Sequence, residues 1–204
     1  LAAAVATAVP VSVPCLQVGT RVGFLFGVGV PVAFLRTYYA GRIGPVGAAW
    51  LLARVVAGLP VRSRLTRNLR ERTAARVSLD GVRWAPTTWV GMGAGTVPSL
   101  GLGFQTCPRT PRAGHLEAYG FGGTPWSVAM CLPAMLRGAT LSGDQVEQAL
   151  GQRLQIEADG PLGYMIDGDL YEGGDTLQVT VPGDVRFLRP AGARALPAPS
   201  LPTG

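Results

Sequence analysis

Residues 163–190 read GYMIDGDLYEGGDTLQVTVPGDVRFLRP, a series of apolar runs separated by Asp-Gly, Gly-Gly and Pro-Gly. Runs rich in Val, Leu, Tyr and Phe that alternate with polar residues are typical of β-strands, and these dipeptides are typical of tight turns. We therefore expect GYMIDGDLY, TLQVTVP and DVRFLRP to form strands. The preceding run, LQIEAD, has the same pattern. The C-terminal part of the chain thus predicts an antiparallel sheet.

The same pattern extends toward the N-terminus. Valine-rich runs predict buried strands over 11–18 and 22–30, and alternating residues around Asp80-Gly81 predict a hairpin. The run TTWVGMGAGTV (87–97) predicts a strand that leads into a glycine-rich turn, and HLEAYGF (115–121) predicts a further strand. Helices are expected over 45–59, over 125–137 (where Pro stands at the start and Gly follows the end) and over 144–150, a short segment with Ser142 or Asp144 as its cap. We find no internal sequence repeat.

Glycine and proline together make up about 23% of the 204 residues, from 29 Gly and 17 Pro, which favours a turn-rich architecture over a helical bundle. With 48% hydrophobic residues the chain can bury a core. The predicted fold class is α+β, mainly an antiparallel β-sandwich with a few helices. We expect the sandwich domain to occupy 1–190 and a flexible tail to occupy 191–204.

Composition also excludes several chemistries. The 18 basic residues are all Arg, so lysine-dependent catalysis is impossible, and the single His rules out a multi-histidine metal site within the chain. The three cysteines, Cys15, Cys107 and Cys131, form no Cys-x-x-Cys pair. Their dispersion indicates buried thiols in a reducing compartment rather than a disulfide framework.

Charge is distributed unevenly along the chain. Residues 1–112 hold 13 Arg and two acids, a net charge of +11, whereas residues 113–204 hold five Arg and ten acids, a net charge of −5. The arginine-rich segment 62–76 is typical either of a solvated face or of a surface that binds an anionic membrane. The apolar segment 1–35 is interrupted by Pro10, Pro14 and Arg21, so we do not expect it to span a membrane.

Two functional motifs, a phosphate-binding loop and a hydrolase triad, are considered and not favoured. The glycine-rich runs 91–96 and 121–124 match neither known phosphate-loop pattern, and we interpret them as turns. His115, Ser127 and Asp144 could be combined into a hydrolase triad, but the chain has no Gly-x-Ser-x-Gly elbow.

The segment Asp167-Gly168-Asp169 has two interpretations. Asp-Gly is a common hairpin turn, and composition alone favours that interpretation. The alternative is a pair of carboxylates at a strand end, where an Asp can accept the proton of a substrate hydroxyl during phosphoryl transfer.

The chain resembles the diacylglycerol kinase and sphingosine kinase family over about residues 20–190. Residues 163–190 resemble the family's C-terminal strands with their Asp-Gly-Glu motif, here Asp167-Gly168-Asp169. Upstream, residues 23–59 resemble the family's glycine-rich strand and the helix that follows it. VSLDGVRW resembles its hairpin, VGMGAGTVPSLGLGF the glycine-rich strand and loop after that hairpin, and PWSVAMCLPAMLRGAT a later helix. The order and spacing of these segments agree with the family.

This resemblance implies an ATP-dependent lipid kinase with two domains. The family's nucleotide domain, which binds ATP with a Gly-Gly-Asp-Gly-Thr loop and holds most of the Mg²⁺ contacts, has no counterpart in this sequence. Because the chain also begins with Leu1, we expect that domain upstream of it. The resemblance assigns proton acceptance to Asp169 and orientation of that group, or indirect support of a metal, to Asp167.

The sequence departs from the family at two places. Asp169 replaces the usual Glu and is one methylene shorter, and Ala113 replaces the first acid of an Asp-Gly-x-Leu-Asp motif that reads Ala113-Gly114-His115-Leu116-Glu117 here. The expected partners are a lipid substrate, an anionic membrane surface from the cytoplasmic side and a second copy in a homodimer, with no nucleic acid. Three alternatives stay open: a non-catalytic lipid-binding module, an arginine-dependent nucleic-acid binder and a kinase of a soluble substrate.

Overall fold

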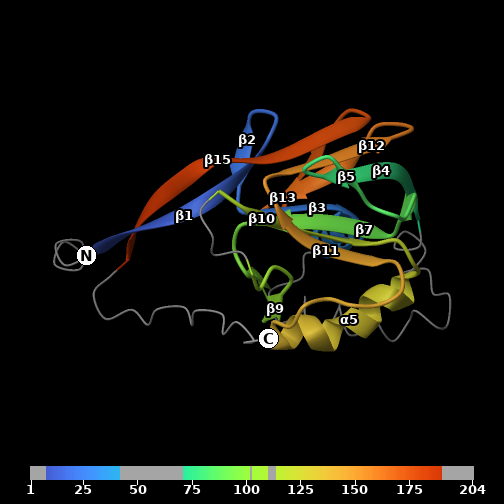
Figure 1. The fold of residues 1–204 in the computed structure, drawn as a ribbon, viewed down its shortest axis with the longest axis horizontal. Coiled ribbons are helices and arrows are strands. Elements are labelled where there is room, and N and C mark those ends of the chain that lie inside the picture. The colour runs from blue at the N-terminus through green and yellow to red at the C-terminus, as the bar shows by residue number, and fades with distance from the viewer. Residues whose placement is uncertain (1–7, 42–70, 102, 110–113, 190–204) are drawn as a thin grey trace.

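Two antiparallel sheets face one another in the computed structural model, which describes residues 8–41, 71–101, 103–109 and 114–189 (Figure 1). Sheet A contains, in spatial order, β2 (Arg21–Gly23), β1 (Val9–Val18), β15 (Thr176–Arg189), β12 (Arg153–Ala158), β4 (Thr73–Leu79) and β5 (Val82–Arg83), with β6 (Thr88–Trp89) paired to β4. Sheet B contains β11 (Val146–Gly151), β10 (Leu116–Phe121), β7 (Gly91–Gly95), β3 (Leu25–Gly29), β13 (Gly163–Ile166) and β14 (Asp169–Glu172).

The remaining described elements are two helices, α2 (Val30–Ala40) and α5 (Pro125–Arg137), and a small ribbon of β8 (Ser99–Gly101) and β9 (Phe104–Gln105). The main core lies between the sheets, where Leu16 and Ile156 of sheet A and Phe26 and Ala118 of sheet B are all essentially inaccessible to solvent. The predicted α+β class with an antiparallel sandwich is therefore confirmed.

The chain uses one topology twice. Strands β1, β2, β3, β4, β5 and β7 correspond in order to β10, β11, β12, β13, β14 and β15, with sheets A and B exchanged. The registers agree with this correspondence. Leu16 pairs with Gly23 as Leu116 pairs with Gly151, and Leu25 pairs with Gly95 as Arg153 pairs with Thr180.

Core positions follow the same correspondence. Leu16 corresponds to Leu116, Phe26 to Leu154, Val28 to Ile156 and Leu79 to Ile166, and all of these side chains are buried. The duplication escapes a search for sequence repeats because the two halves share the apolar character of these positions and only a few residue identities.

Several predicted elements are confirmed. Turn residues 80 and 81 join β4 to β5, residues 116–121 form β10, and α5 spans the predicted 125–137. In α5 Pro125 stands at the start, Thr124 and Ser127 form a capping box, and Gly138 ends the helix with a φ of 63°.

Other predictions are corrected. The predicted short helix over 144–150 is wrong, because residues 146–151 form β11, an edge strand whose pairing with β10 overrides local helix preference. The predicted strand over 22–30 is divided where the chain passes from sheet A to sheet B, and α2 begins at Val30. The two predicted C-terminal strands are one strand, β15. The predicted helix 45–59, most of the arginine segment 62–76 and the tail 191–204 lie outside the described residues.

No helix among the described residues combines the length and apolar character needed to cross a membrane.

Candidate functional site

Asp167 and Gly168 form the two-residue turn between β13 and β14. Their φ angles are 51° and 101°, both positive, as a type I′ hairpin turn requires. Asp and Gly tolerate this conformation better than most residues, so the local sequence determines the turn. The hairpin interpretation of this motif therefore describes its backbone correctly.

The carboxylate of Asp167 is bound to the backbone of a neighbouring strand. It accepts hydrogen bonds from the N–H of Phe24 at 3.0 Å and from the N–H of Leu25 at 2.8 Å. The N–H of Asp167 donates in turn to the carbonyl oxygen of Leu25 at 3.0 Å. We call this arrangement an Asp-Gly clasp. Its acceptor oxygens are occupied, so Asp167 holds the turn against the start of β3.

Asp169 differs from Asp167 in its exposure and its contacts. It is exposed at the beginning of β14, and its carboxylate makes no hydrogen bond or ion pair with the residues that the structure describes. Its partner in the ladder is Ile166, whose side chain is buried in the core. Because paired residues in an antiparallel ladder share a face, Asp169 lies on the face of sheet B that looks toward sheet A.

The duplicated topology contains a second Asp-Gly clasp. Asp80 and Gly81 have φ angles of 50° and 83° in the turn between β4 and β5. The Asp80 carboxylate accepts the N–H groups of Gln152 and Arg153, and the Asp80 N–H donates to the carbonyl of Arg153 at 2.9 Å. The clasp is therefore a feature of the fold rather than of a site.

The residue after each clasp differs. Asp169 follows the clasp in sheet B, whereas the corresponding position in sheet A is Val82, which is 70% exposed. The fold thus does not require a carboxylate at this position. We call the edge formed by β2 and β14 the site edge, and the edge formed by β11 and β5 the opposite edge.

Tyr39 of α2 is an additional contact at the site edge. Its hydroxyl donates to the carbonyl of Gly168 at 2.8 Å. On the outer face of β14, Arg36 of α2 forms an ion pair of 2.9 Å with Glu172, and both side chains are mostly exposed. Neither contact was predictable from local sequence, because each joins residues more than 120 positions apart.

The glycine-rich runs are neither phosphate loops nor, in the first case, turns. Residues 91–95 form β7, a fully buried central strand. A side chain at Gly93 would overlap the ring and hydroxyl of Tyr119, so glycine lets that ring lie flat on the sheet. The run 121–124 leads into α5, where the N–H of Thr124 donates to the Ser127 hydroxyl as a helix cap. Ser127 therefore caps a helix, and the triad interpretation gains no support from it.

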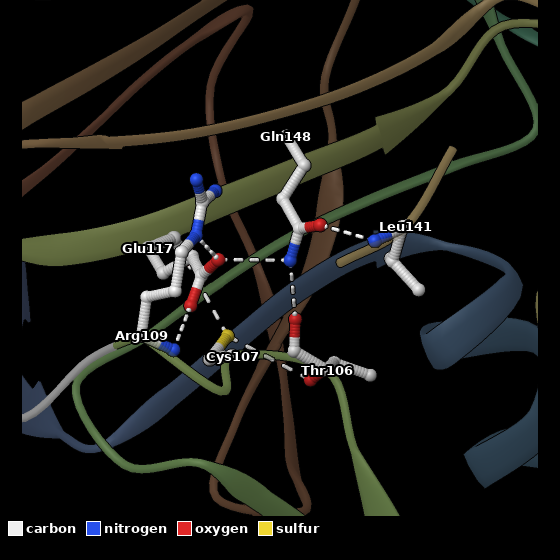
Figure 2. Close-up of polar contacts among 6 residues, drawn as sticks. All are labelled: Thr106, Cys107, Arg109, Glu117, Leu141 and Gln148. Carbon is white, nitrogen blue, oxygen red and sulfur yellow. Dashed lines mark hydrogen bonds and ion pairs between the residues drawn. The ribbon is translucent and has the colours of Figure 1, made fainter. Parts of the chain in front are cut away.

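A buried polar cluster, unforeseen in the sequence, surrounds Glu117 on β10 (Figure 2). Its carboxylate is inaccessible and accepts from the Arg109 backbone N–H and Nε, both at 2.7 Å, and from Gln148 Nε2 at 2.9 Å. Gln148 Nε2 also donates to the carbonyl oxygen of Thr106 at 3.1 Å, and Gln148 Oε1 accepts from the N–H of Leu141 at 2.5 Å. These bonds satisfy the buried charge and fasten the segment after β9 to sheet B, so the cluster is structural. Ala113 lies outside the described residues.

The cysteines are buried, as the sequence predicted, and are not in disulfides. Burial raises the pKa of the Cys107 thiol far above its usual range, and it does the same to the pKa of the Tyr119 hydroxyl. Burial also raises the pKa of Cys131. These groups stay protonated at neutral pH and offer no thiolate nucleophile.

The donor groups present decide whether this chain could hold a metal ion by itself. The described part of the chain contains no group of three or more His, Cys, Asp or Glu side chains that could hold an ion. Mg²⁺ prefers several oxygen ligands in a near-octahedral arrangement. The described side chains alone therefore do not fit Mg²⁺.

No family model matches the sequence, and no curated protein matches it. Solved structures do match the fold. One described as "a putative diacylglycerol kinase from Bacillus anthracis str. Sterne" has a TM-score of 0.60 and 11% identity over 86% of this chain. A crystal structure with the same description has a TM-score of 0.59 and 12% identity over 86%. A third, of "a diacylglycerol kinases" from the same strain, has a TM-score of 0.51 and 12% identity over 85%.

This chain covers 55%, 55% and 52% of those three structures. It therefore spans about half of their length. The chain shares its fold with these structures, as its resemblance to the diacylglycerol kinases led us to expect.

Proposed function

We propose that this chain is the lipid-binding half of an ATP-dependent lipid kinase, with Asp169 as the proton acceptor. The proposal rests on the contrast between the two clasps. Asp169 is exposed and its carboxylate is unbound, at a position where the fold accepts Val82. The shared fold with structures described as diacylglycerol kinases supports a diacylglycerol-like or sphingoid-like alcohol as the substrate.

The proposed step is an in-line phosphoryl transfer. Asp169 accepts the proton of the lipid hydroxyl as its oxygen forms a bond to the γ-phosphorus of ATP, and the bond from that phosphorus to the bridging oxygen breaks to release ADP. Asp167 acts as a positioning residue. Its clasp fixes the turn, and therefore the start of β14, against β3. Positioning matters because a displacement of about 1 Å can lower a rate on the order of 100-fold.

ATP and Mg²⁺ belong to the proposed nucleotide-binding half rather than to the described residues. This chain contains no Gly-Gly-Asp-Gly-Thr loop. We propose that such a domain lies upstream and that the assembled enzyme works at an anionic membrane surface on the cytoplasmic side. The excess of arginine in residues 1–112 supports this location.

The test is an activity assay on the protein encoded together with its upstream sequence. Asp169→Asn should lower transfer of radiolabelled phosphate to diacylglycerol by at least about 100-fold, because the general base is removed. Asp169→Glu should retain part of the activity, and Asp159→Asn, which alters an exposed acid in the loop between β12 and β13, should retain all of it. Full activity in Asp169→Asn would overturn the proposal. Absence of an upstream nucleotide domain would instead favour the non-catalytic lipid-binding module.

A further inference from the structure

Arg21 is a second charged residue at the site edge. It lies on β2, the edge strand of sheet A, and pairs in the ladder with Val18, whose side chain is buried in the core. The Arg21 side chain is therefore on the face of sheet A that looks toward sheet B. Its guanidinium carbon lies 3.9 Å from the centre of the Tyr171 ring on β14. Arg21 thus joins the edges of the two sheets.

The position of Tyr171 places Arg21 near Asp169. Asp169 and Tyr171 are two positions apart and on the same face of β14, which corresponds to about 7 Å along a strand. No carboxylate among the described residues forms an ion pair with Arg21. Arg36, by contrast, lies on the outer side of β14, where Glu172 already neutralises it.

Stacking leaves the hydrogen-bonding capacity of Arg21 available. A guanidinium that lies over an aromatic ring uses its flat face, whereas its N–H donors point outward in the plane. That arrangement suits bidentate binding of a phosphate group.

The duplicated topology shows that the fold does not need this arginine. The position that corresponds to Arg21 is Ala149 on β11, and the position that corresponds to Tyr171 is Trp84, which follows β5. The opposite edge therefore carries Ala149, Trp84 and Val82 where the site edge carries Arg21, Tyr171 and Asp169. Arg21 and Asp169 are thus both replaced by apolar residues at the equivalent positions.

We infer that Arg21 binds the phosphate group at the site edge, as the phosphoryl group arrives and as the phosphate monoester of the lipid product. This inference rests on the proposed kinase function and names the residue that binds the transferred phosphoryl group. Arg21 neutralises the anion, and Asp169 accepts the proton. The two roles come from different sheets, so the sandwich itself sets the distance between them.

The experiment measures binding in the absence of ATP. Wild-type full chain and variants are titrated calorimetrically with inorganic phosphate and, separately, with monomeric dioctanoyl phosphatidic acid. Arg21→Ala should weaken phosphatidic acid binding about tenfold, because a charge-assisted hydrogen bond is lost. Arg21→Lys should lose less, because the charge remains. Arg83→Ala, which removes an exposed arginine from β5 at the opposite edge, is the matched control and should bind as the wild type does.

The two probes distinguish the source of the phosphate. Equal losses with both probes mean that Arg21 recognises the phosphate group itself, and a loss only with phosphatidic acid means that it recognises the lipid headgroup. The unfolding midpoint of Arg21→Ala should stay near that of the wild type, since alanine occupies the equivalent position.

The inference is overturned if Arg21→Ala binds phosphatidic acid as the wild type does, or if the wild type binds neither probe. Because no turnover is measured, this result is separate from the Asp169→Asn assay, which decides the kinase function.

Discussion

The site edge and the opposite edge of this sandwich have the same backbone plan and different side chains. Each has a hairpin closed by Asp-Gly, and in each the Asp carboxylate binds two N–H groups of a chain segment that crosses between the sheets. Asp167 and Asp80 have φ angles of 51° and 50°. Their close agreement shows that this aspartate is explained by the fold.

A short set of residues at the site edge is not explained by the fold. Asp169 and Arg21 correspond to Val82 and Ala149 at the opposite edge. A duplicated fold thus provides an internal control for separating structural from functional charged residues. Variants at equivalent positions can therefore test whether the two clasps are equivalent and whether the residues that differ between the two edges carry the function.

The glycines packed against the two clasps should be the positions where substitution lowers stability most. Each stands just before the residues whose N–H groups bind the clasp aspartate. A side chain at Gly23 would overlap Ile166 and the Asp167 carboxylate, and one at Gly151 would lie 2.7 Å from atoms of Leu79 and Asp80. We expect Gly23→Ala and Gly151→Ala each to lower the free energy of unfolding by about 2–3 kcal/mol, through overpacking. Urea denaturation measures this. A stable Gly23→Ala variant would mean that the clasp tolerates displacement.

The two aspartates of the clasps should be equivalent in stability. Asp167→Ala and Asp80→Ala should each cost about 2 kcal/mol, since each removes charge-assisted hydrogen bonds and places alanine at positive φ. Thermal unfolding of both variants checks the prediction. A difference well above about 1 kcal/mol between them would break the structural equivalence of the two edges.

None of the described residues takes the place of Tyr39 at the Asp80 clasp, so Tyr39 should stabilise the site edge alone. Tyr39→Phe removes the hydrogen bond to the Gly168 carbonyl and should lower the free energy of unfolding by about 0.5–1 kcal/mol. Chemical denaturation of this variant, alone and combined with Asp167→Ala, measures the effect. Additive losses would show that Tyr39 acts independently of the clasp.

A carboxylate placed at the opposite edge should have the smallest effect. Val82 is exposed, so Val82→Asp should change the free energy of unfolding by less than about 0.5 kcal/mol. It should also leave phosphoryl transfer unchanged. A large destabilisation would show that an acid after the clasp is unfavourable in this fold and that the surroundings of the site edge compensate for it.

Much of the fold followed from local sequence. Alternation and Asp-Gly predicted the hairpin at Asp80-Gly81 and favoured one at Asp167-Gly168, and Pro125 and Gly138 predicted the limits of α5. Predictions failed where distant partners decide the structure. Residues 146–151 form a strand because β10 lies beside them. Glycine-rich β7 is a strand because it pairs with both β3 and β10, and its Gly93 leaves space for the ring of Tyr119.

The candidate site was only partly predictable for the same reason. Asp167 and Asp169 were recognised as a pair, but their neighbours in sequence could not show that one binds the backbone and the other is exposed. Arg21 was visible only as an interruption of an apolar run. Its contact with Tyr171 joins residues 150 positions apart, and no local pattern predicts such a contact.

The division of roles between the two aspartates can be tested by comparing Asp169→Asn with Asp167→Asn in the protein that includes the upstream sequence, with kinase turnover and unfolding measured on the same samples. We expect Asp169→Asn to lose at least about 100-fold in turnover at unchanged stability, whereas Asp167→Asn should lose stability as well. Normal turnover in a stable Asp169→Asn enzyme would contradict the assignment of Asp169 as the proton acceptor.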